Sequence, residues 1–159
     1  TSPESMLEVS LSTIKMLTDK KYVGIVLSAS RPYSNLANLY KRNKINIDKL
    51  FFIDCVTDKP DGEEKSDSVT YLDVSNLTNI AIALNAAIKQ IKCNKFVYID
   101  SITTLLIHNP TNSLVKFIHL IVTSMRIKET NCLLISSKGE TQKEVRAQIA
   151  QLCDKVIEV

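Results

Sequence analysis

The feature that most constrains the fold of this chain is a series of short apolar runs that alternate with segments of helical periodicity. The clearest runs are residues 50–56 (LFFIDCV) and 95–100 (KFVYID). Continuous apolar runs are typical of strands buried on both faces of a parallel sheet, whereas strands with one solvated face alternate apolar and polar residues. Strands that alternate with helices form right-handed βαβ units. The sequence therefore predicts an α/β fold of three layers, with a mainly parallel sheet between two layers of helices.

The same two patterns predict the remaining elements and one exposed loop. Further strands are predicted over residues 22–27, 69–74, 132–135 and 155–159. Helices are predicted over residues 4–18, near residues 36–40 with Ser34 as the cap, from Ser75 or Asn76 to Ile91, from Asn112 to Met125, and after the capping box of residues 141–144. Residues 57–68 (TDKPDGEEKSDS) are polar and have no apolar period, which predicts an exposed loop. The length of 159 residues fits a single domain over the whole chain.

Composition and charge argue against several classes of protein. The net charge of +3 is too small to indicate a nucleic-acid partner by itself. The four cysteines, at positions 55, 93, 132 and 153, form no CxxC pair, which argues against a zinc site. The longest apolar runs are too short to span a bilayer, and we see no secretory signal. We therefore expect a cytoplasmic protein without membrane contact.

Polar side chains gather at the predicted strand ends, where ligands bind to open parallel sheets. Asp100 directly follows an apolar run. In nucleotide-binding sheets an acid at this place holds magnesium, but an aspartate at a strand-to-loop turn also bonds to the nearby backbone. The residues alone leave both roles open for Asp100 and favour the backbone role for Asp54. Arg31 could meet a phosphate or carboxylate, or could simply solvate a turn.

Two kinds of catalytic machinery have no counterpart in the sequence. A triphosphate needs a glycine-rich loop of backbone N–H groups and a lysine. The glycines stand at positions 24, 62 and 139, and none precedes Lys-Ser or Lys-Thr. The serines at positions 28, 30, 136 and 137 have no base visible in the sequence, and no GxSxG elbow occurs. We therefore expect neither a phosphate cradle nor a serine hydrolase within these residues.

With this order of elements, the chain resembles the archaeal branch of the RecA/KaiC-like ATPases. The resemblance runs from about residue 4 to the end and is carried by GIVLSASRPYSNL, KLFFIDCVT with SNLTNIAIALNAAI, FVYIDSITTLL with NSLVKFIHLIVTSMR, and AQLCDKVIEV. It implies a RecA-like P-loop NTPase core that occupies residues 1–159 as one domain. It also implies that Asp100 matches the magnesium acid of the family and that Ser101 follows it as in the family.

The chain departs from this family at two places. The phosphate loop of the family would precede the helix at residues 4–18, where the chain has only TSPE. The catalytic glutamate would end the strand written VLSAS, where Ser30 and Arg31 stand, and neither polarises water as a carboxylate does. We therefore expect a degenerate domain in which Asp100, Ser101 and Arg31 remain from a nucleotide site. We also expect residues upstream of Thr1 to supply the first strand, or the sheet to close over its absence.

Three functions are compatible with this reading of the sequence. The first is a non-hydrolysing RecA-like domain that binds a protein partner, either a related ATPase or a second copy, and needs no cofactor. The second is weak binding or hydrolysis of ATP with Mg²⁺ at Asp100, Ser101 and Arg31, with Asp100 as the metal ligand. The third is a nucleic-acid-binding relative of the recombinases, supported only by a modest excess of lysine.

Overall fold

The computed structural model describes residues 3–58, 67–138 and 143–159. Its helices and strands alternate along the chain, as the apolar runs predict. In chain order they are α1 (Pro3–Asp19), β1 (Val23–Ser28), α2 (Tyr33–Arg42), the 3₁₀ turn η1 (Ile47–Lys49), β2 (Leu50–Asp54), β3 (Val69–Tyr71), α3 (Leu77–Gln90), β4 (Lys95–Asp100), α4 (Ile102–His108), α5 (Thr111–Ile127), β5 (Asn131–Leu134) and α6 (Lys143–Leu152).

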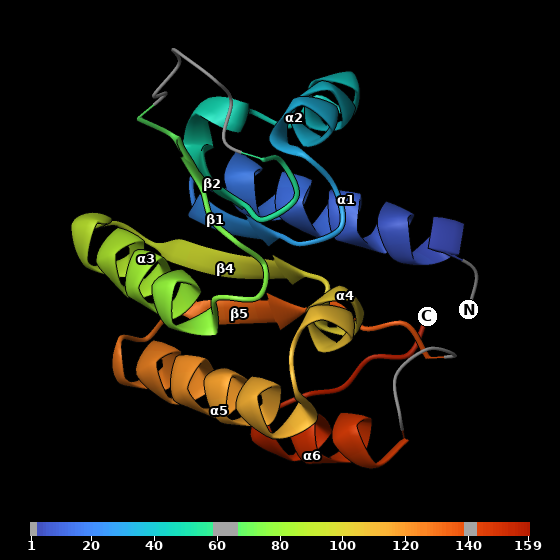
Figure 1. Ribbon diagram of the computed structural model, residues 1–159. Helices are drawn as coiled ribbons and strands as arrows, with labels where there is room; N and C mark the ends of the chain where they lie inside the picture. Colours follow the sequence, from blue (N-terminus) through green and yellow to red (C-terminus); the bar gives the residue numbers. More distant parts are fainter. Residues whose placement is uncertain (1–2, 59–66, 139–142) are drawn as a thin grey trace.

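The strands form one parallel sheet in the order β3-β2-β1-β4-β5. Strand β1 lies at its centre between β2 and β4. The register pairs Ser28 with Asp54 on one side and with Asp100 on the other, so these three strands end level with one another. In Figure 1 the arrowheads of β4 and β5 point towards α4, which marks the carboxyl edge of the sheet. The predicted parallel sheet is confirmed.

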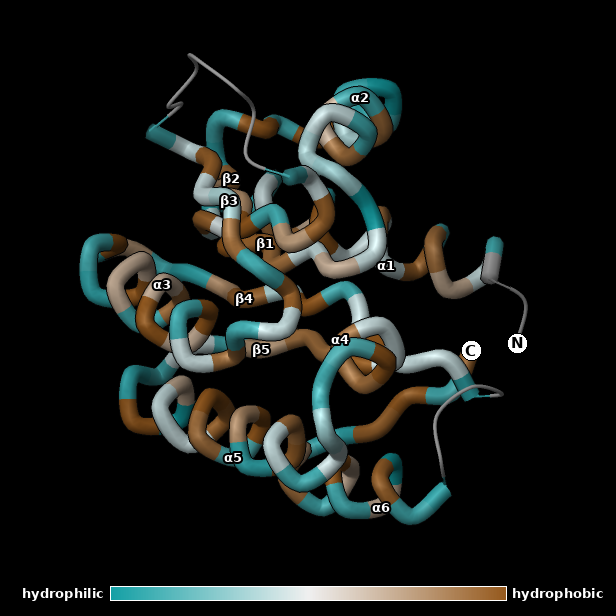
Figure 2. Tube along the Cα trace, viewed as in Figure 1, coloured by the Kyte–Doolittle hydropathy of each residue, from teal (hydrophilic) through white to brown (hydrophobic). Residues whose placement is uncertain are grey.

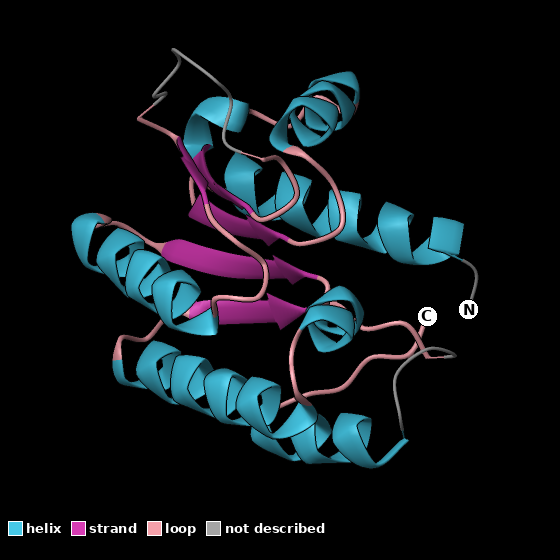
Figure 3. Cartoon of the chain, in the orientation of Figure 1, coloured by secondary structure: helices cyan, strands magenta, loops and turns pink. Residues whose placement is uncertain are grey.

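Helices cover both faces of this sheet, as Figures 1 and 3 show. On one face α1 and α2 contribute Ile14, Leu36 and Tyr40 to a cluster with the side chains of β1, β2 and β4. On the other face α3, α4, α5 and α6 share a larger cluster with the same strands. In Figure 2 brown, hydrophobic segments recur along the strands and helices, between teal, hydrophilic ones. The architecture is therefore the three-layer α/β core that the sequence predicts, and it is consistent with a RecA-like core.

Local sequence explains why these elements form and fit together. Ile80, Leu84 and Ile88 follow a spacing of four residues in α3, and all three are buried. In β1, Gly24 lies where a Cβ atom would come within 2.5 Å of the Phe96 ring and 2.6 Å of a Leu50 methyl group. The close approach of these side chains requires glycine at this position.

Among the helices of the described residues, none combines the length and apolar character needed to cross a lipid bilayer.

Several expected boundaries hold and others shift by a few residues. Strand β4 has the predicted bounds, and Asn76 caps α3 by accepting a hydrogen bond from the Asn79 backbone N–H at 3.0 Å. Strands β2 and β3 end two and three residues earlier than predicted. Most of the predicted loop, residues 59–66, and the first half of the predicted capping box, residues 141–142, lie outside the described residues.

Two expectations were wrong, and one helix was not predicted. Residues 155–159 form no strand: Val156 and Ile157 are 60% and 69% exposed, because no neighbouring element covers them. Ser34 does not cap α2, since it lies inside the first turn of that helix and the N-cap position is Pro32. Helix α4 was not predicted, although the Ser101 hydroxyl caps it by accepting a hydrogen bond from the Thr104 N–H at 3.2 Å.

Candidate functional site

A network of hydroxyl groups joins the end of β1 to the start of α4 at the carboxyl edge. The Ser30 Oγ lies 2.9 Å from Thr104 Oγ1 and donates a longer bond of 3.4 Å to Ser101 Oγ. The Ser101 and Thr104 hydroxyls are themselves 3.0 Å apart. Ser101 takes this position because it is the N-cap of α4, and Ser30 because β1 ends two residues earlier. The three side chains form one polar cluster at the carboxyl edge of the sheet, which we call the hydroxyl cluster.

Asp100 is the last residue of β4, lies beside this cluster and is half-buried. Burial raises the pKa of its carboxyl group, while the charge of Arg31 and a hydrogen bond from Ser30 act in the opposite direction. Burial is the largest of these effects, so the protein favours the neutral form of Asp100 more than water does. The peptide bond between Asp100 and Ser101 is cis. Asp100 is thus a carboxyl group whose charge is only partly compensated by its surroundings.

The turn after β1 fixes the position of Arg31. The Ser28 hydroxyl donates a 2.6 Å bond to the Arg31 carbonyl and accepts one from the Arg31 N–H at 3.2 Å. The charge of Arg31 also lowers the pKa of Tyr40 and Tyr98, whereas burial, the larger effect, raises both above the ordinary value for tyrosine. Arg31 and Asp100 therefore lie near each other above two buried tyrosines, on the face of the sheet covered by α1 and α2.

Asp54, the other carboxylate at this edge, is only 1% exposed, and its oxygens are taken up by hydrogen bonds. Its Oδ1 accepts bonds from the backbone N–H groups of Val56 and Thr57, at 2.8 and 2.9 Å. Its Oδ2 accepts bonds from the Thr57 hydroxyl at 2.6 Å and from the Tyr33 N–H, in the first turn of α2, at 2.8 Å. Asp54 therefore caps α2 from a neighbouring strand and orders the loop after β2. The backbone role favoured by the sequence is confirmed.

The structure brings together the three residues that the sequence proposed for the site. Asp100 and Ser101 are neighbours in the chain, and Arg31 acts on Asp100 from the end of the adjacent strand. From the sequence, Ser30 was placed at the end of the strand VLSAS without a role in the site, and Thr104 was not named. These two residues are 74 positions apart and meet through the parallel pairing of β1 with β4. The spacing of Ser101 and Thr104 was an available signal, because it is typical of a helix N-cap.

These residues do not fit a magnesium–triphosphate group. Asp100 is the one carboxylate of the hydroxyl cluster, and its burial opposes the charge that a metal ligand carries. The hydroxyls of Ser30, Ser101 and Thr104 already bond to one another. We therefore derive no chemical step through ATP or Mg²⁺ here.

Comparison with known proteins supports the assignment of the fold. No curated protein matches this chain significantly. The family model described as "ATPase: KaiC" matches residues 18–159, which include every strand of the sheet and the residues of the site. On this match and the three-layer parallel architecture, the chain belongs to the family of KaiC-like ATPase domains.

Proposed function

We propose that this domain is a degenerate member of the family that does not hydrolyse ATP and acts by binding a protein partner. The observation that carries the proposal is the state of the carboxyl edge, where the polar groups are used in internal contacts. Asp54 accepts four hydrogen bonds, and the hydroxyls of Ser30, Ser101 and Thr104 bond to one another, with Ser30 also bonding to Asp100. Residues at the end of β1 are serine and arginine, which do not act as a general base for water.

The same edge carries exposed apolar side chains that suit a protein contact. Ile107 of α4 is 73% exposed, and Val56, in the loop after β2, is 41% exposed. Val56 follows the end of β2, and Ile107 lies in α4, the helix that begins directly after Asp100 and Ser101. Apolar side chains beside a polar centre are typical of protein interfaces, which combine an apolar core with a polar rim. We infer that this edge contacts a second copy of the chain or a related ATPase.

Isothermal titration calorimetry with ATP and Mg²⁺ tests the first half of the proposal. We expect no binding in the micromolar range, for the native chain and for Asp100→Ala alike, because neither offers a cradle for the phosphates. A phosphate-binding ATPase measured in the same buffer serves as the positive control. Micromolar binding that Asp100→Ala abolishes would contradict the proposal and favour a weak nucleotide site at Asp100, Ser101 and Arg31.

Sedimentation velocity over a range of protein concentrations tests the second half. We expect reversible association that is lost when Val56 and Ile107 are both replaced by glutamate. The matched control is Ile127→Glu, which changes an equally apolar and exposed side chain at the far end of α5. A monomer at every concentration would exclude self-association and leave a related ATPase as the partner. Equal loss of association in the control variant would place the contact elsewhere.

A further inference from the structure

Five lysines gather at the amino edge of the sheet, opposite the site described above. Lys20 and Lys21 lie between α1 and β1, Lys92 lies between α3 and β4, Lys95 is the first residue of β4, and Lys128 lies between α5 and β5. Strands β1, β4 and β5 are adjacent in the sheet, and the register pairs Val23 with Lys95 and Phe96 with Asn131. Three connections that are distant in sequence therefore meet side by side. We call these five residues the amino-edge lysine cluster.

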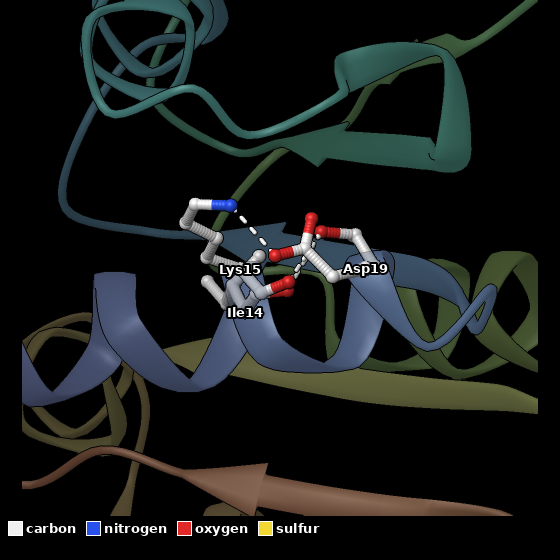
Figure 4. Close-up of polar contacts among 4 residues, drawn as sticks. Ile14, Lys15 and Asp19 are labelled. Carbon is white, nitrogen blue, oxygen red and sulfur yellow. Dashed lines mark hydrogen bonds and ion pairs between the residues drawn. The ribbon is translucent and has the colours of Figure 1, made fainter.

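Few acidic groups compensate the charge of this cluster. Asp19 forms an ion pair of 2.6 Å with Lys15 along α1, as Figure 4 shows, and is thereby engaged by a lysine outside the cluster. Glu129 is the other acid in the three connections. Among the described residues, no ion pair involves Glu129 or any lysine of the cluster. The five lysines outnumber the two nearby acids, Asp19 and Glu129, so this region carries a net positive charge on a chain whose net charge is only +3.

The cluster borders a shallow groove of about 230 Å³. It is lined by three lysines, one acid and four uncharged residues: Lys92, Lys95, Lys128, Glu129, Tyr22, Cys93, Asn94 and Asn131. Lys95 Nζ donates one bond to the Ile91 carbonyl at 2.9 Å, and Lys128 Nζ donates one to Asn85 Oδ1 at 3.0 Å. An ammonium group has three donors, so each of these two lysines is held in place and keeps donors for a ligand.

Part of this arrangement serves the fold itself. Cations stabilise the carbonyl ends of helices, and the bond from Lys95 to the Ile91 carbonyl beyond the end of α3 is an instance. This explanation does not extend to Lys20, Lys21 and Lys92, which are exposed and make no side-chain hydrogen bond or ion pair among the described contacts. Lys92 lines the groove beside the two oriented ammonium groups, and Lys20 and Lys21 lie in the connection before the adjacent strand β1. This arrangement suits a ligand with several negative charges.

We propose that the amino-edge lysine cluster binds the phosphate backbone of single-stranded nucleic acid. Lysine neutralises phosphates as a point charge, and a basic groove with an aromatic ring is the usual means of binding single strands without sequence preference. The amide groups of Asn94 and Asn131 offer both donors and acceptors to bases. An anionic lipid surface fits less well, because the groove is concave and its lining is polar. This site lies at the opposite edge from Asp100 and does not depend on the proposed protein contact.

Fluorescence anisotropy with a labelled polythymidine of about 20 nucleotides tests the proposal over a salt series. If about three phosphates are neutralised, the logarithm of the binding constant falls with the logarithm of salt concentration with a slope of about −2. This slope corresponds to binding about 16-fold weaker when the salt rises from about 50 to about 200 mM. Absence of binding at the low salt concentration would overturn the proposal, and so would binding that salt does not weaken.

Paired charge reversals locate the site. We expect the double variant Lys20→Glu with Lys92→Glu to weaken binding by about tenfold or more. The double variant Lys20→Arg with Lys92→Arg keeps both positive charges and should bind as the native chain does. The matched control is Lys116→Glu with Lys143→Glu, which makes the same change of net charge at exposed positions on α5 and α6. Circular dichroism checks that both variants fold. Equal loss in the control would show binding by net charge alone and would overturn the assigned site.

Competition distinguishes the kind of anion. Vesicles of phosphatidylserine and phosphatidylcholine, inorganic phosphate and the unlabelled oligonucleotide are each added to the labelled complex. We expect only the oligonucleotide to displace the probe at low concentration. Displacement by vesicles at lower phosphate concentration than the oligonucleotide would overturn the proposal in favour of a lipid surface. Displacement by inorganic phosphate at equal phosphate concentration would reduce the site to a general anion site and would also overturn it.

Discussion

At the scale of single residues, the most informative contrast is between the two aspartates that end β2 and β4. Both follow an apolar run, and the register places them on either side of Ser28. Asp54 is saturated by four donors and serves the fold, whereas Asp100 remains half-buried beside Arg31 and the hydroxyl cluster. The same sequence pattern thus gives two different roles, and the difference comes from the loops that follow.

We predict that Asp54→Asn destabilises the protein by about 1–3 kcal/mol, because an amide nitrogen replaces one of two oxygens that face N–H and O–H donors. The free energy of unfolding, measured with urea, reports this change. The control is Asp48→Asn, the same substitution at an exposed position before β2, for which we expect a change within about 0.5 kcal/mol. An equal effect in both variants would contradict a structural role specific to Asp54.

A second prediction concerns the pH dependence of stability. Burial raises the pKa of Asp100 above the ordinary 3.8, so its proton binds more tightly in the folded protein than in the unfolded chain. The resulting contribution to stability is complete below the ordinary value and is lost as the pH rises through the raised value. Urea unfolding at several pH values should therefore show the native chain losing stability relative to Asp100→Asn as the pH rises. Arg31→Gln removes an opposing charge and should enlarge this loss, whereas parallel curves for native chain and Asp100→Asn would refute the prediction.

A third prediction concerns Gly24. A methyl group there would overlap the Phe96 ring and the Leu50 side chain, both fully buried. Overfilling a core in this way costs about 1–3 kcal/mol, so Gly24→Ala should lower the urea midpoint accordingly. Adding Phe96→Leu to Gly24→Ala relieves the contact, and the double variant should be more stable than the sum of the two single changes predicts. Strict additivity would show that the contact does not limit stability.

At the scale of elements, the sequence predicts the strands well where burial decides them. The predicted bounds of β4 are correct because polar residues on both sides of an apolar run mark where the strand begins and ends. Residues 155–159 show a similar apolar pattern, but they form no strand, because a strand also needs a partner. Two exposed ion pairs lie at this part of the chain, one between Arg126 and Asp154, directly before the segment, and one between Lys138 and Glu158, within it.

The candidate site is predictable to a similar extent. Asp100, Ser101 and Arg31 were predicted together because parallel strands end at one edge of the sheet. Ser30 and Thr104 were not, since their contact depends on α4, a helix of seven residues that the sequence pattern did not reveal. Short helices depend on their caps and packing more than on periodicity, so apolar spacing alone does not detect them.

A fourth prediction follows from this dependence on the cap of α4. Ser101→Ala removes the acceptor for the Thr104 N–H and should destabilise the protein by about 0.5–2 kcal/mol. Hydrogen exchange should accelerate in α4 more than in α5, since α4 is the helix that loses its cap. Ser101→Asn keeps a side-chain acceptor and should restore most of the protection. Uniform acceleration along the chain would show a global effect and contradict this prediction.

At the scale of the whole molecule, every strand of the described sheet runs in the same direction, and this gives the domain two chemically different ends. A partner that covers α4 and the loop after β2 leaves the segments before β1, β4 and β5 open to solvent, and the reverse also holds. Ligands of the two ends would thus not compete, and one copy could tether a nucleic-acid strand to another protein. Mixing labelled oligonucleotide with protein at concentrations that favour association should then yield a ternary assembly instead of an exchange of one ligand for the other.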